Sequence, residues 1–315
     1  MLDWTDRHCR SFHRLLSPHA RLYTEMVTAG ALLHGDAPRH LDFDPAEHPL
    51  ALQLGGSDAA ELARCAKMGE DWGYDEINLN CGCPSERVQR GSFGVCLMAE
   101  PDLVADCVRA MRDAVSIPVT IKHRLGIDRN EDYGFVRDFV GRTREAGCGV
   151  FIVHARNAWL KGLSPRENRE VPPLRYEAAR RLKADFPDAT IVLNGGIADA
   201  VDAQLLLEGV DGLMLGRAAY RDPFVLARFE DTLFGPGSVR RPLDVIAPLT
   251  RYLQAAAARG TPPWAVVRHT LGLFHGCRGA RHWRQQLSDP VFVHEHGADA
   301  LQAAAREFLD VEGVA

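Results

Sequence analysis

Residues 76–98, with the sequence EINLNCGCPSERVQRGSFGVCLM, begin as a short apolar segment and continue into a loop rich in glycine and cysteine. Ile77 and Leu79 alternate with two asparagines, which is the two-residue period of a strand. Pro84 ends the pattern because proline has no N–H group to contribute to a sheet. The stretch therefore predicts a strand whose carboxyl end opens directly into a loop.

Cys83 lies just beyond the end of that predicted strand. In proteins with parallel strands, ligands and reactive side chains gather at the carboxyl ends of the strands. A single cysteine taken alone is more often a small buried hydrophobic residue. The neighbouring carboxamides and glycines make a thiol at a site of chemistry an equally good interpretation.

The chain has 315 residues, of which 46% are hydrophobic and 25% are charged, and a formal net charge of −5. This is enough for one large domain and a smaller appendage. The cysteines are scattered and no signal peptide precedes them, so we expect reduced thiols and a cytoplasmic location. They lack the spacing of a zinc site, and no apolar run could span a membrane, so we expect no metal and no membrane partner.

Seven apolar runs have the pattern of strands, and helical patterns lie between them. The predicted strands are residues 21–26, 50–54, 76–81, 118–123, 150–155, 190–194 and 212–215. The helical patterns are residues 57–71, 102–115, 131–146, 174–185 and 199–208, with Ser57, Asp102 and Asp199 placed as N-caps. This α/β alternation indicates a parallel sheet and predicts a (β/α)₈ barrel of the TIM type. A doubly wound sheet would need a glycine-rich dinucleotide loop after an early strand, and the sequence has none.

Seven strands leave one strand of such a barrel unaccounted for, and we expect it to be the first. Residues 3–16 already have a helical pattern that Asp3 or Thr5 could cap. The hypothesis that follows is that the coding start lies upstream of Met1.

Beyond residue 236 the strand patterns end. A Gly-Pro-Gly-Ser sequence is followed by helical runs at residues 243–258, 262–276, 279–288 and 298–310. We therefore expect a barrel domain over residues 1–236 and an all-helical domain over residues 237–315.

The predicted helical domain has a basic segment. Residues 245–288 contain no Asp or Glu, and their arginines are Arg251, Arg259, Arg268, Arg278, Arg281 and Arg284. On an acidic chain, such a segment suggests a polyanion as partner, with Trp283, His269, His275 and His282 able to stack on bases or to pair with phosphates. The alternative is a solvated helix face.

Polar side chains follow nearly every predicted strand. In chain order they are Gln53, Asn80 with Cys83, Lys122 with Arg124, His154 with Arg156, Asn194-Gly195-Gly196 and Gly216-Arg217. Strand ends converge on one mouth of a barrel, and the last two loops of such barrels commonly bind phosphate through backbone N–H groups. A phosphorylated cofactor is implied, and Lys122 could place a positive charge against a flavin ring. Each residue alone could be an ordinary surface residue, but the six groups in register favour one site.

These motifs resemble those of the tRNA-dihydrouridine synthases, and most closely their A subfamily. The Asn-Cys-Gly-Cys-Pro-Ser sequence is highly specific, and the matching segments follow in order from residue 1 to about residue 285. They are residues 2–8, 51–54, 79–85, 121–126, 153–156, 167–174 and 194–197.

The resemblance implies flavin mononucleotide (FMN) at the barrel mouth, reduced by NADPH. It implies hydride transfer to C6 of a uridine that has left the base stack, at positions 20 and 20a of the tRNA D-loop. A cysteine protonates C5, and the cysteine before Pro-Ser is Cys83, so Cys81 and Cys96 would be packed bystanders. A thiol is mostly protonated at neutral pH, whereas a carboxylate would be ionised, so the chemistry suits a cysteine independently of the resemblance.

The resemblance also assigns residues to each ligand. The flavin would be held by Met1, Leu2, Gln53, Lys122, His154, Asn194, Gly195, Gly196, Gly216 and Arg217. The tRNA would contact Asn80, Arg124, Arg166, Asn168, Arg169, Arg281 and Arg284, and the enzyme would act as a monomer. From their charge, we expect the basic segments 166–169 and 281–284 to face one groove and to bind the same polyanion. The family has Ala-Pro immediately before the position of Met1, so a chain that starts at Met1 would bind flavin less tightly.

Two other interpretations come from different classes of protein. One is a flavin-free nucleic-acid-binding protein, against which the presence of Cys83, Lys122 and His154 argues. The other is a flavin-dependent oxidoreductase of small molecules, which gives no reason for a helical segment without acidic residues. Flavin absorbance of the purified protein distinguishes the first alternative, and salt-sensitive tRNA binding distinguishes the second.

Overall fold

The computed structural model describes residues 1–85, 88, 91–237 and 239–312. Glu86, Arg87, Gln89 and Arg90 of the 76–98 stretch, Ser238 near the predicted domain boundary and residues 313–315 lie outside the described part.

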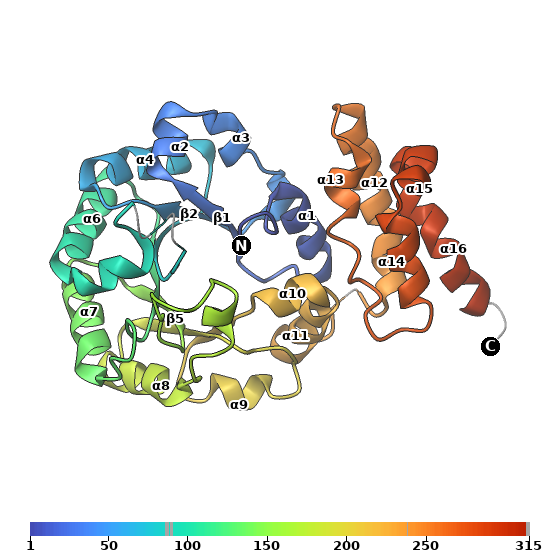
Figure 1. Ribbon diagram of the computed structural model, residues 1–315. Helices are drawn as coiled ribbons and strands as arrows, with labels where there is room; N and C mark the ends of the chain where they lie inside the picture. Colours follow the sequence, from blue (N-terminus) through green and yellow to red (C-terminus); the bar gives the residue numbers. More distant parts are fainter. Residues whose placement is uncertain (86–87, 89–90, 238, 313–315) are drawn as a thin grey trace.

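Within the described residues, seven parallel strands form one sheet in chain order, which curls with helices on its outside (Figure 1). The strands are β1 Leu22–Thr28, β2 Leu50–Gly55, β3 Glu76–Cys81, β4 Val119–Arg124, β5 Val150–His154, β6 Thr190–Asn194 and β7 Gly212–Met214. Each lies within one residue or two of its predicted range. The architecture is a TIM-type barrel wall followed by a group of C-terminal helices, as predicted.

No strand of the described residues closes the sheet between β1 and β7. Residues 1–6 lie across that side. The backbone N–H of Asp3 donates to the carboxylate of Glu25 on β1, and Met1 Sδ lies 3.9 Å from the place that a Cβ on Gly216 would occupy. The N-terminal segment therefore touches both edges of the sheet at the mouth.

The helices that follow the strands cover the outer surface of the sheet (Figure 1). They are α1 Arg7–Leu16, α2 Ala29–His34, α3 Ala37–Leu41, α4 Ala59–Trp72, α6 Pro101–Ala114, α7 Tyr133–Glu145, α8 Tyr176–Asp185, α9 Ala203–Leu207, α10 Arg217–Arg221 and α11 Val225–Phe234. The short helices α2 and α3 have no counterpart in the predicted pattern.

Ser57, Asp102 and Asp199 do not cap helices as predicted. Asp58 caps α4 by accepting a backbone N–H at 2.8 Å, Asp102 falls inside the first turn of α6, and α9 begins further along the chain. A cap must be the last extended residue before the helix, where its side chain faces the free N–H groups, and composition alone does not fix that position.

The C-terminal helices are α12 Ile246–Ala258, α13 Pro263–Val267, α14 Ala280–Ser288, α15 Pro290–His296 and α16 Ala300–Glu312. The run predicted at residues 262–276 is helical only over α13. The backbone at Gly272 approaches the barrel so closely that a Cβ would lie 2.3 Å from the carbonyl oxygen of Arg221. Residues 268–276 form turns, in which Gly272 lies against Arg221 of α10.

Trp283 is a core residue of the C-terminal helices, which contradicts its predicted role in base stacking. It is fully buried, its indole N–H donates to the carbonyl of Thr270 at 2.9 Å, and its ring packs edge-on against Phe274. His269 is also buried and cannot stack on a base. Only one face of a short amphipathic helix is exposed to solvent. On α14 that face carries Arg281 and Arg284, and Trp283 lies on the buried face.

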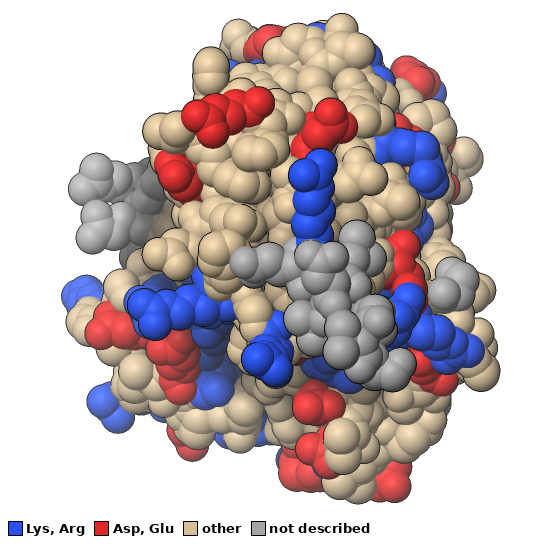
Figure 2. Space-filling view, turned by 90° about the vertical axis from the view of Figure 1, so that its right-hand side faces the viewer, with Lys and Arg blue, Asp and Glu red and all other residues tan. Residues whose placement is uncertain are grey.

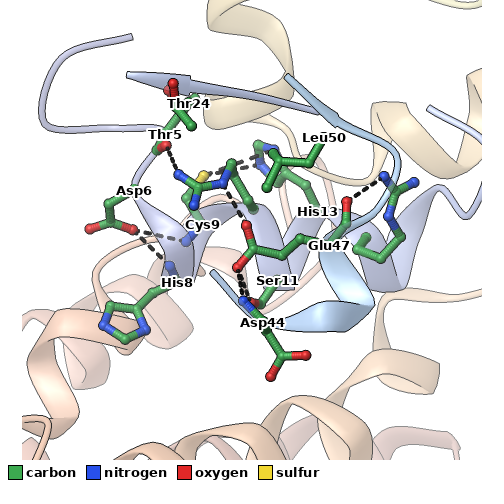
Figure 3. A network of polar contacts seen from close by, with 12 residues as sticks. Thr5, Asp6, His8, Cys9, Ser11, His13, Thr24, Asp44, Glu47 and Leu50 are labelled. Carbon is green, nitrogen blue, oxygen red and sulfur yellow. Dashed lines mark hydrogen bonds and ion pairs between the residues drawn. The ribbon is translucent and has the colours of Figure 1, made fainter. Parts of the chain in front are cut away.

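Asp6 joins the barrel to the C-terminal helices, and it caps α1 in place of the predicted Asp3 or Thr5. Its carboxylate accepts the backbone N–H groups of His8 and Cys9 at 3.0 Å and pairs with Arg268 at 2.5 Å and with His269 at 3.0 Å. Helix α1 is anchored in turn to the barrel wall by the buried Arg10–Glu47 pair at 2.6 Å. Figure 3 shows Glu47 directed toward α1 between Ser11 and Asp44.

Basic residues gather on the face formed by the C-terminal helices. Lys and Arg form a band across the middle of that face, and Asp and Glu are more frequent above and below it (Figure 2). Arg278, Arg281 and Arg284 are exposed. None of the described helices combines the length and the apolar character needed to cross a membrane.

Candidate active site

The sheet brings the predicted strand-end residues to one mouth. Asn80 lies opposite Lys122, Arg124 opposite His154, and His154 opposite Asn194 in the strand register. Hydrogen bonds connect them across the strands, because Lys122 Nζ donates to Asn194 Oδ1 at 3.1 Å and Asn80 Nδ2 donates to Gln53 Oε1 at 2.8 Å.

Asn80 shapes the loop that carries Cys83. Its Oδ1 accepts the backbone N–H groups of Gly82 at 3.1 Å and Cys83 at 2.9 Å. On the other side, the Cys83 carbonyl accepts the N–H of Val95 at 3.1 Å. Gly94 has φ +67° and approaches so closely that a Cβ there would lie 2.7 Å from the Cys83 oxygen. The loop therefore holds Cys83 in one conformation.

The two neighbouring cysteines have different environments. The side chain of Cys83 is partly exposed, with Sγ 3.5 Å from Ser85 Oγ. Cys81 is fully buried, and burial raises the pKa of its thiol well above the ordinary range. Cys96 is partly buried, with its thiol pKa also raised by burial. Of the two thiols in the Cys81-Gly82-Cys83 sequence, only Cys83 can meet a ligand.

The mouth is electropositive around Cys83. Lys122, Arg124 and Arg169 all interact electrostatically with its thiol. Burial, followed by repulsion from other cations, lowers the pKa of Lys122 to about 7 and that of Arg124 to about 9. The same causes hold the pKa of His154 well below its ordinary range, so its imidazole is neutral. Such a cluster favours an anionic ligand.

Arg124 and Asn168 were predicted to contact tRNA, and the structure finds both side chains buried. Arg124 is 2% exposed and donates to three backbone carbonyls, those of Gly82, Asn157 and Asn168, each at 2.9 Å. Asn168 is fully buried, accepts from the backbone N–H of Trp159 at 2.7 Å and donates to its carbonyl at 2.8 Å. Both side chains hold loops of the mouth together by hydrogen bonds, and neither is exposed to solvent.

Asn80 was also predicted to contact the RNA, and its side chain is largely buried. It is 8% exposed, and its amide oxygen and one amide hydrogen already have protein partners. By contrast, Arg166 and Arg169 are exposed in the loop that contains the short helix η3 Glu167–Arg169. These two arginines remain candidates for a ligand outside the barrel.

The loops after β6 and β7 form a cradle of free N–H groups. Within the described residues, the backbone N–H groups of Gly195, Gly196, Gly216 and Arg217 donate no hydrogen bond. Gly195 has φ +118°, and a Cβ there would lie 2.8 Å from the ring of His154. Free N–H groups beside a cluster of cations fit the phosphate of a cofactor.

Other residues were assigned to the flavin by resemblance, and those assignments stay predictions. Met1 lies beside Gly216, as described above for the sheet edges, whereas Leu2 is 60% exposed. Arg217 pairs with Glu170 and donates to the Arg169 carbonyl at 3.0 Å, so it links the cradle to the exposed loop. No three His, Cys, Asp or Glu side chains of the described residues are grouped to hold a metal ion.

Two contributors to the mouth were not predicted from the sequence. Tyr176 opens α8 and donates its hydroxyl to the Gly195 carbonyl at 2.6 Å, which fixes the glycine loop. Asn157 donates to the carbonyl of Asn130 at 2.6 Å and accepts from Arg175 at 2.7 Å, so it joins two loops. Their partners come from separate loops, and no local sequence pattern indicates such contacts.

The lowered pKa of Lys122 predicts a pH-dependent stability of the flavin-free protein. An unfolded lysine keeps a pKa near 10.5, so between about pH 7 and that value the unfolded chain binds more protons than the folded one. Stability from this group therefore rises with pH across the window. We expect flavin-free Lys122→Met to unfold at a higher temperature than wild type at pH about 6, with a difference that shrinks toward pH about 10. A difference in unfolding temperature that stays constant with pH contradicts the lowered pKa of Lys122.

The fold and the site define a class: a TIM-type barrel whose mouth combines a partly exposed thiol, a cluster of cations and a cradle for an anion. The sequence matches the family described as Dihydrouridine synthase over residues 1–309. The chain belongs to the dihydrouridine synthase family and is an oxidoreductase that forms dihydrouridine.

Several relatives carry the name tRNA-dihydrouridine(20/20a) synthase. The relative from Pseudomonas putida is 56% identical over 310 residues, which cover 96% of this chain and 92% of that protein. The relative from Xanthomonas campestris is 57% identical over 310 residues, with 98% and 92% covered. The relative from Vibrio parahaemolyticus is 51% identical over 306 residues, with 96% and 94% covered.

Proposed function

We propose that this chain reduces the 5,6-double bond of uridines at positions 20 and 20a of tRNA, with FMN at the barrel mouth, NADPH as reductant and Cys83 as proton donor. The names of the relatives support the positions. The observation that carries the chemical assignment is the partly exposed Cys83, held at the mouth by Asn80 and surrounded by cations. We also propose that the enzyme acts in the cytoplasm as a monomer.

The residues of the cradle and the mouth would hold the cofactor. The free N–H groups of Gly195, Gly196, Gly216 and Arg217 suit its phosphate, while Gln53, Lys122, His154 and Asn194 line the mouth beside them. When bound, the flavin supplies the hydride that C6 of uracil receives.

Cys83 completes the reduction with a proton. The S–H bond breaks as the proton goes to C5, and a thiolate remains beside Arg124, Arg169 and Lys122. These cations stabilise the negative charge that the step leaves on sulfur. Cys83 lies just past the end of β3, among the ends of the neighbouring strands, so a uridine would have to leave the base stack to reach it.

Exposed arginines would bind the rest of the tRNA. Arg166 and Arg169 are exposed in the loop that contains η3, and Arg281 and Arg284 are exposed on α14. Phosphate contacts of this kind give affinity without reading sequence.

Removing two of these charges should act on tRNA alone. We expect Arg281→Ala with Arg284→Ala to raise KM for tRNA and to lower the slope of log Kd against log salt by roughly one to two units, because each lost phosphate contact retains its counterions. Binding titrations at several salt concentrations measure this. The matched control is Arg142→Ala with Arg144→Ala on α7, which should bind tRNA as wild type does. Unchanged affinity and slope in the α14 variant contradict the proposed surface.

The proposed function is tested with purified protein and tRNA that lacks dihydrouridine. We expect dihydrouridine to form at positions 20 and 20a when NADPH is supplied. Mass spectrometry of tRNA fragments locates the product. Formation only at other positions contradicts the site preference, and no formation with a flavin-loaded protein contradicts the activity.

A further inference from the structure

Five buried polar side chains form a continuous chain inside the barrel. They are Asn80, Gln53, Asn78, Thr120 and Glu76, with exposed fractions of 8%, 9%, 0%, 0% and 4%. The interior of such a barrel is normally filled by branched apolar side chains, and buried polar groups are costly without partners. Gln53 lies opposite Asn78, and Asn78 opposite Thr120, so these three share one layer.

Every hydrogen bond in the chain points toward Glu76. Asn80 Nδ2 donates to Gln53 Oε1 at 2.8 Å, and Gln53 Nε2 donates to Asn78 Oδ1 at 2.9 Å. Asn78 Nδ2 donates to Thr120 Oγ1 at 2.8 Å. Thr120 Oγ1 donates to Glu76 Oε1 at 2.6 Å. No donor in the series runs the other way.

The carboxylate of Glu76 sets this direction. It also receives Tyr23 Oη and Arg21 Nη1, each at 3.1 Å. Burial raises the pKa of Glu76, whereas the hydrogen bonds from Thr120 and Tyr23 and the pairing with Arg21 favour the ionised form, which only accepts hydrogen bonds. The Thr120 hydroxyl must therefore donate to Glu76, which leaves its oxygen to accept from Asn78. Each amide then has its N–H₂ group on the Glu76 side and its oxygen on the side of the mouth.

The last oxygen in the series is Asn80 Oδ1, which accepts the N–H groups of Gly82 and Cys83. Aligned hydrogen bonds polarise one another, so the chain makes this oxygen a better acceptor. If Asn80 were reversed, its N–H₂ group would face two backbone donors, and the loop would lose both bonds.

We propose that Glu76, Thr120 and Asn78 are positioning residues for Cys83, which act through Gln53 and Asn80 from inside the barrel. The carboxylate fixes the orientation of each amide in turn and so holds the loop that presents the thiol. Amide groups do not pass protons readily, so the chain orders the site and does not resupply the proton. The link to catalysis rests on the proposed role of Cys83, whereas the link to loop conformation does not.

Thr120→Val breaks the chain with a side chain of nearly the same shape, and Thr120→Ser keeps the hydroxyl. We expect Thr120→Val to lower kcat for dihydrouridine formation by about tenfold and to change the alkylation rate of Cys83 by iodoacetamide by a similar factor. KM for NADPH should stay as in wild type. Thr120→Ser should restore both values. A Thr120→Val protein that matches wild type in kcat and alkylation overturns the proposal.

Glu76→Gln tests the origin of the direction, because a carboxamide can donate as well as accept. We expect the same change in Cys83 alkylation, and Glu230→Gln provides the matched control. Glu230 is a buried carboxylate on α11 that accepts a hydrogen bond from Ser17 Oγ at 2.6 Å. It is not part of the hydrogen-bonded series from Asn80 to Glu76. An equal effect in Glu230→Gln would mean that the change reflects general destabilisation, which overturns the proposal.

The wild-type protein offers a test that does not depend on a variant folding. Neutron diffraction from deuterated crystals should place deuterons on Asn80 Nδ2, Gln53 Nε2, Asn78 Nδ2 and Thr120 Oγ1, each directed toward Glu76. One reversed amide overturns the proposal. If Cys83→Ala retains dihydrouridine formation, the proposed role of Cys83 is wrong, but the neutron and alkylation results still decide whether the chain positions the loop.

Discussion

Cys83→Ala should reduce dihydrouridine formation by about 10²–10⁴-fold, the usual contribution of a general acid, while the flavin remains bound and NADPH is still oxidised. Alanine fits the space of the thiol, and the loop is held by backbone contacts of Cys83, its N–H to Asn80 and its carbonyl to Val95, which the substitution leaves in place. The loss should therefore be confined to proton delivery.

The matched control is Cys81→Ala, two residues away. Cys81 is fully buried with its thiol pKa well above the ordinary range, so it should contribute packing and no proton. Initial rates of dihydrouridine formation, compared with rates of flavin bleaching by NADPH, separate the two steps. A loss in Cys83→Ala of less than about tenfold, or an equal loss in Cys81→Ala, refutes the assignment of the acid.

Lys122→Met should slow both flavin reduction by NADPH and uridine reduction, by roughly 10²-fold. The ammonium group lies at the mouth and donates to Asn194 at 3.1 Å. Burial, followed by repulsion from Arg124 and Arg169, lowers its pKa to about 7 in the flavin-free protein. An anionic ring nearby would offset that repulsion and keep the group charged. Methionine keeps the length of the side chain but removes this charge.

Stopped-flow measurement of flavin bleaching tests this effect on the cofactor separately from tRNA. The control is Lys67→Met on the outer helix α4, where the lysine is exposed and pairs with Glu70 and Asp71, and its rates should equal those of wild type. If Lys122→Met bleaches at the wild-type rate, the charge does not act on the flavin.

The sequence predicted the strand ends and the residues that meet at the mouth, because alternation and turn residues are local signals. Gln53, Asn80, Lys122 and His154 each follow or end an apolar run, and parallel strands bring such ends together. The family resemblance then singled out Cys83 from the neighbouring Cys81, and the structure finds only the former partly exposed.

The burial of polar residues by contacts with distant loops could not be predicted in this way. Arg124 and Asn168 have the polarity of surface residues, but their partners are backbone carbonyls and N–H groups in segments far along the chain. Trp283 was placed on the wrong face of its helix for the same reason, since its partners Thr270 and Phe274 lie in an irregular segment.

The hydrogen-bonded series inside the barrel could not be predicted from the sequence either. Asn78 alternates with apolar residues as any inward-facing strand residue does, and nothing nearby identifies Thr120 or Glu76 as its successors. The direction of the bonds emerges only when three strands, β2, β3 and β4, are placed side by side and the carboxylate is found at one end.

A strain that lacks the gene shows whether this chain reduces uridine in tRNA with Cys83 as the acid. Dihydrouridine is mapped at positions 20 and 20a of its tRNA, with and without plasmid copies of the wild-type gene and of Cys83→Ala. We expect dihydrouridine to be absent at these positions, to return with the wild-type gene and not to return with the variant. Unchanged dihydrouridine at both positions in the deletion strain, or full restoration by Cys83→Ala, would contradict it.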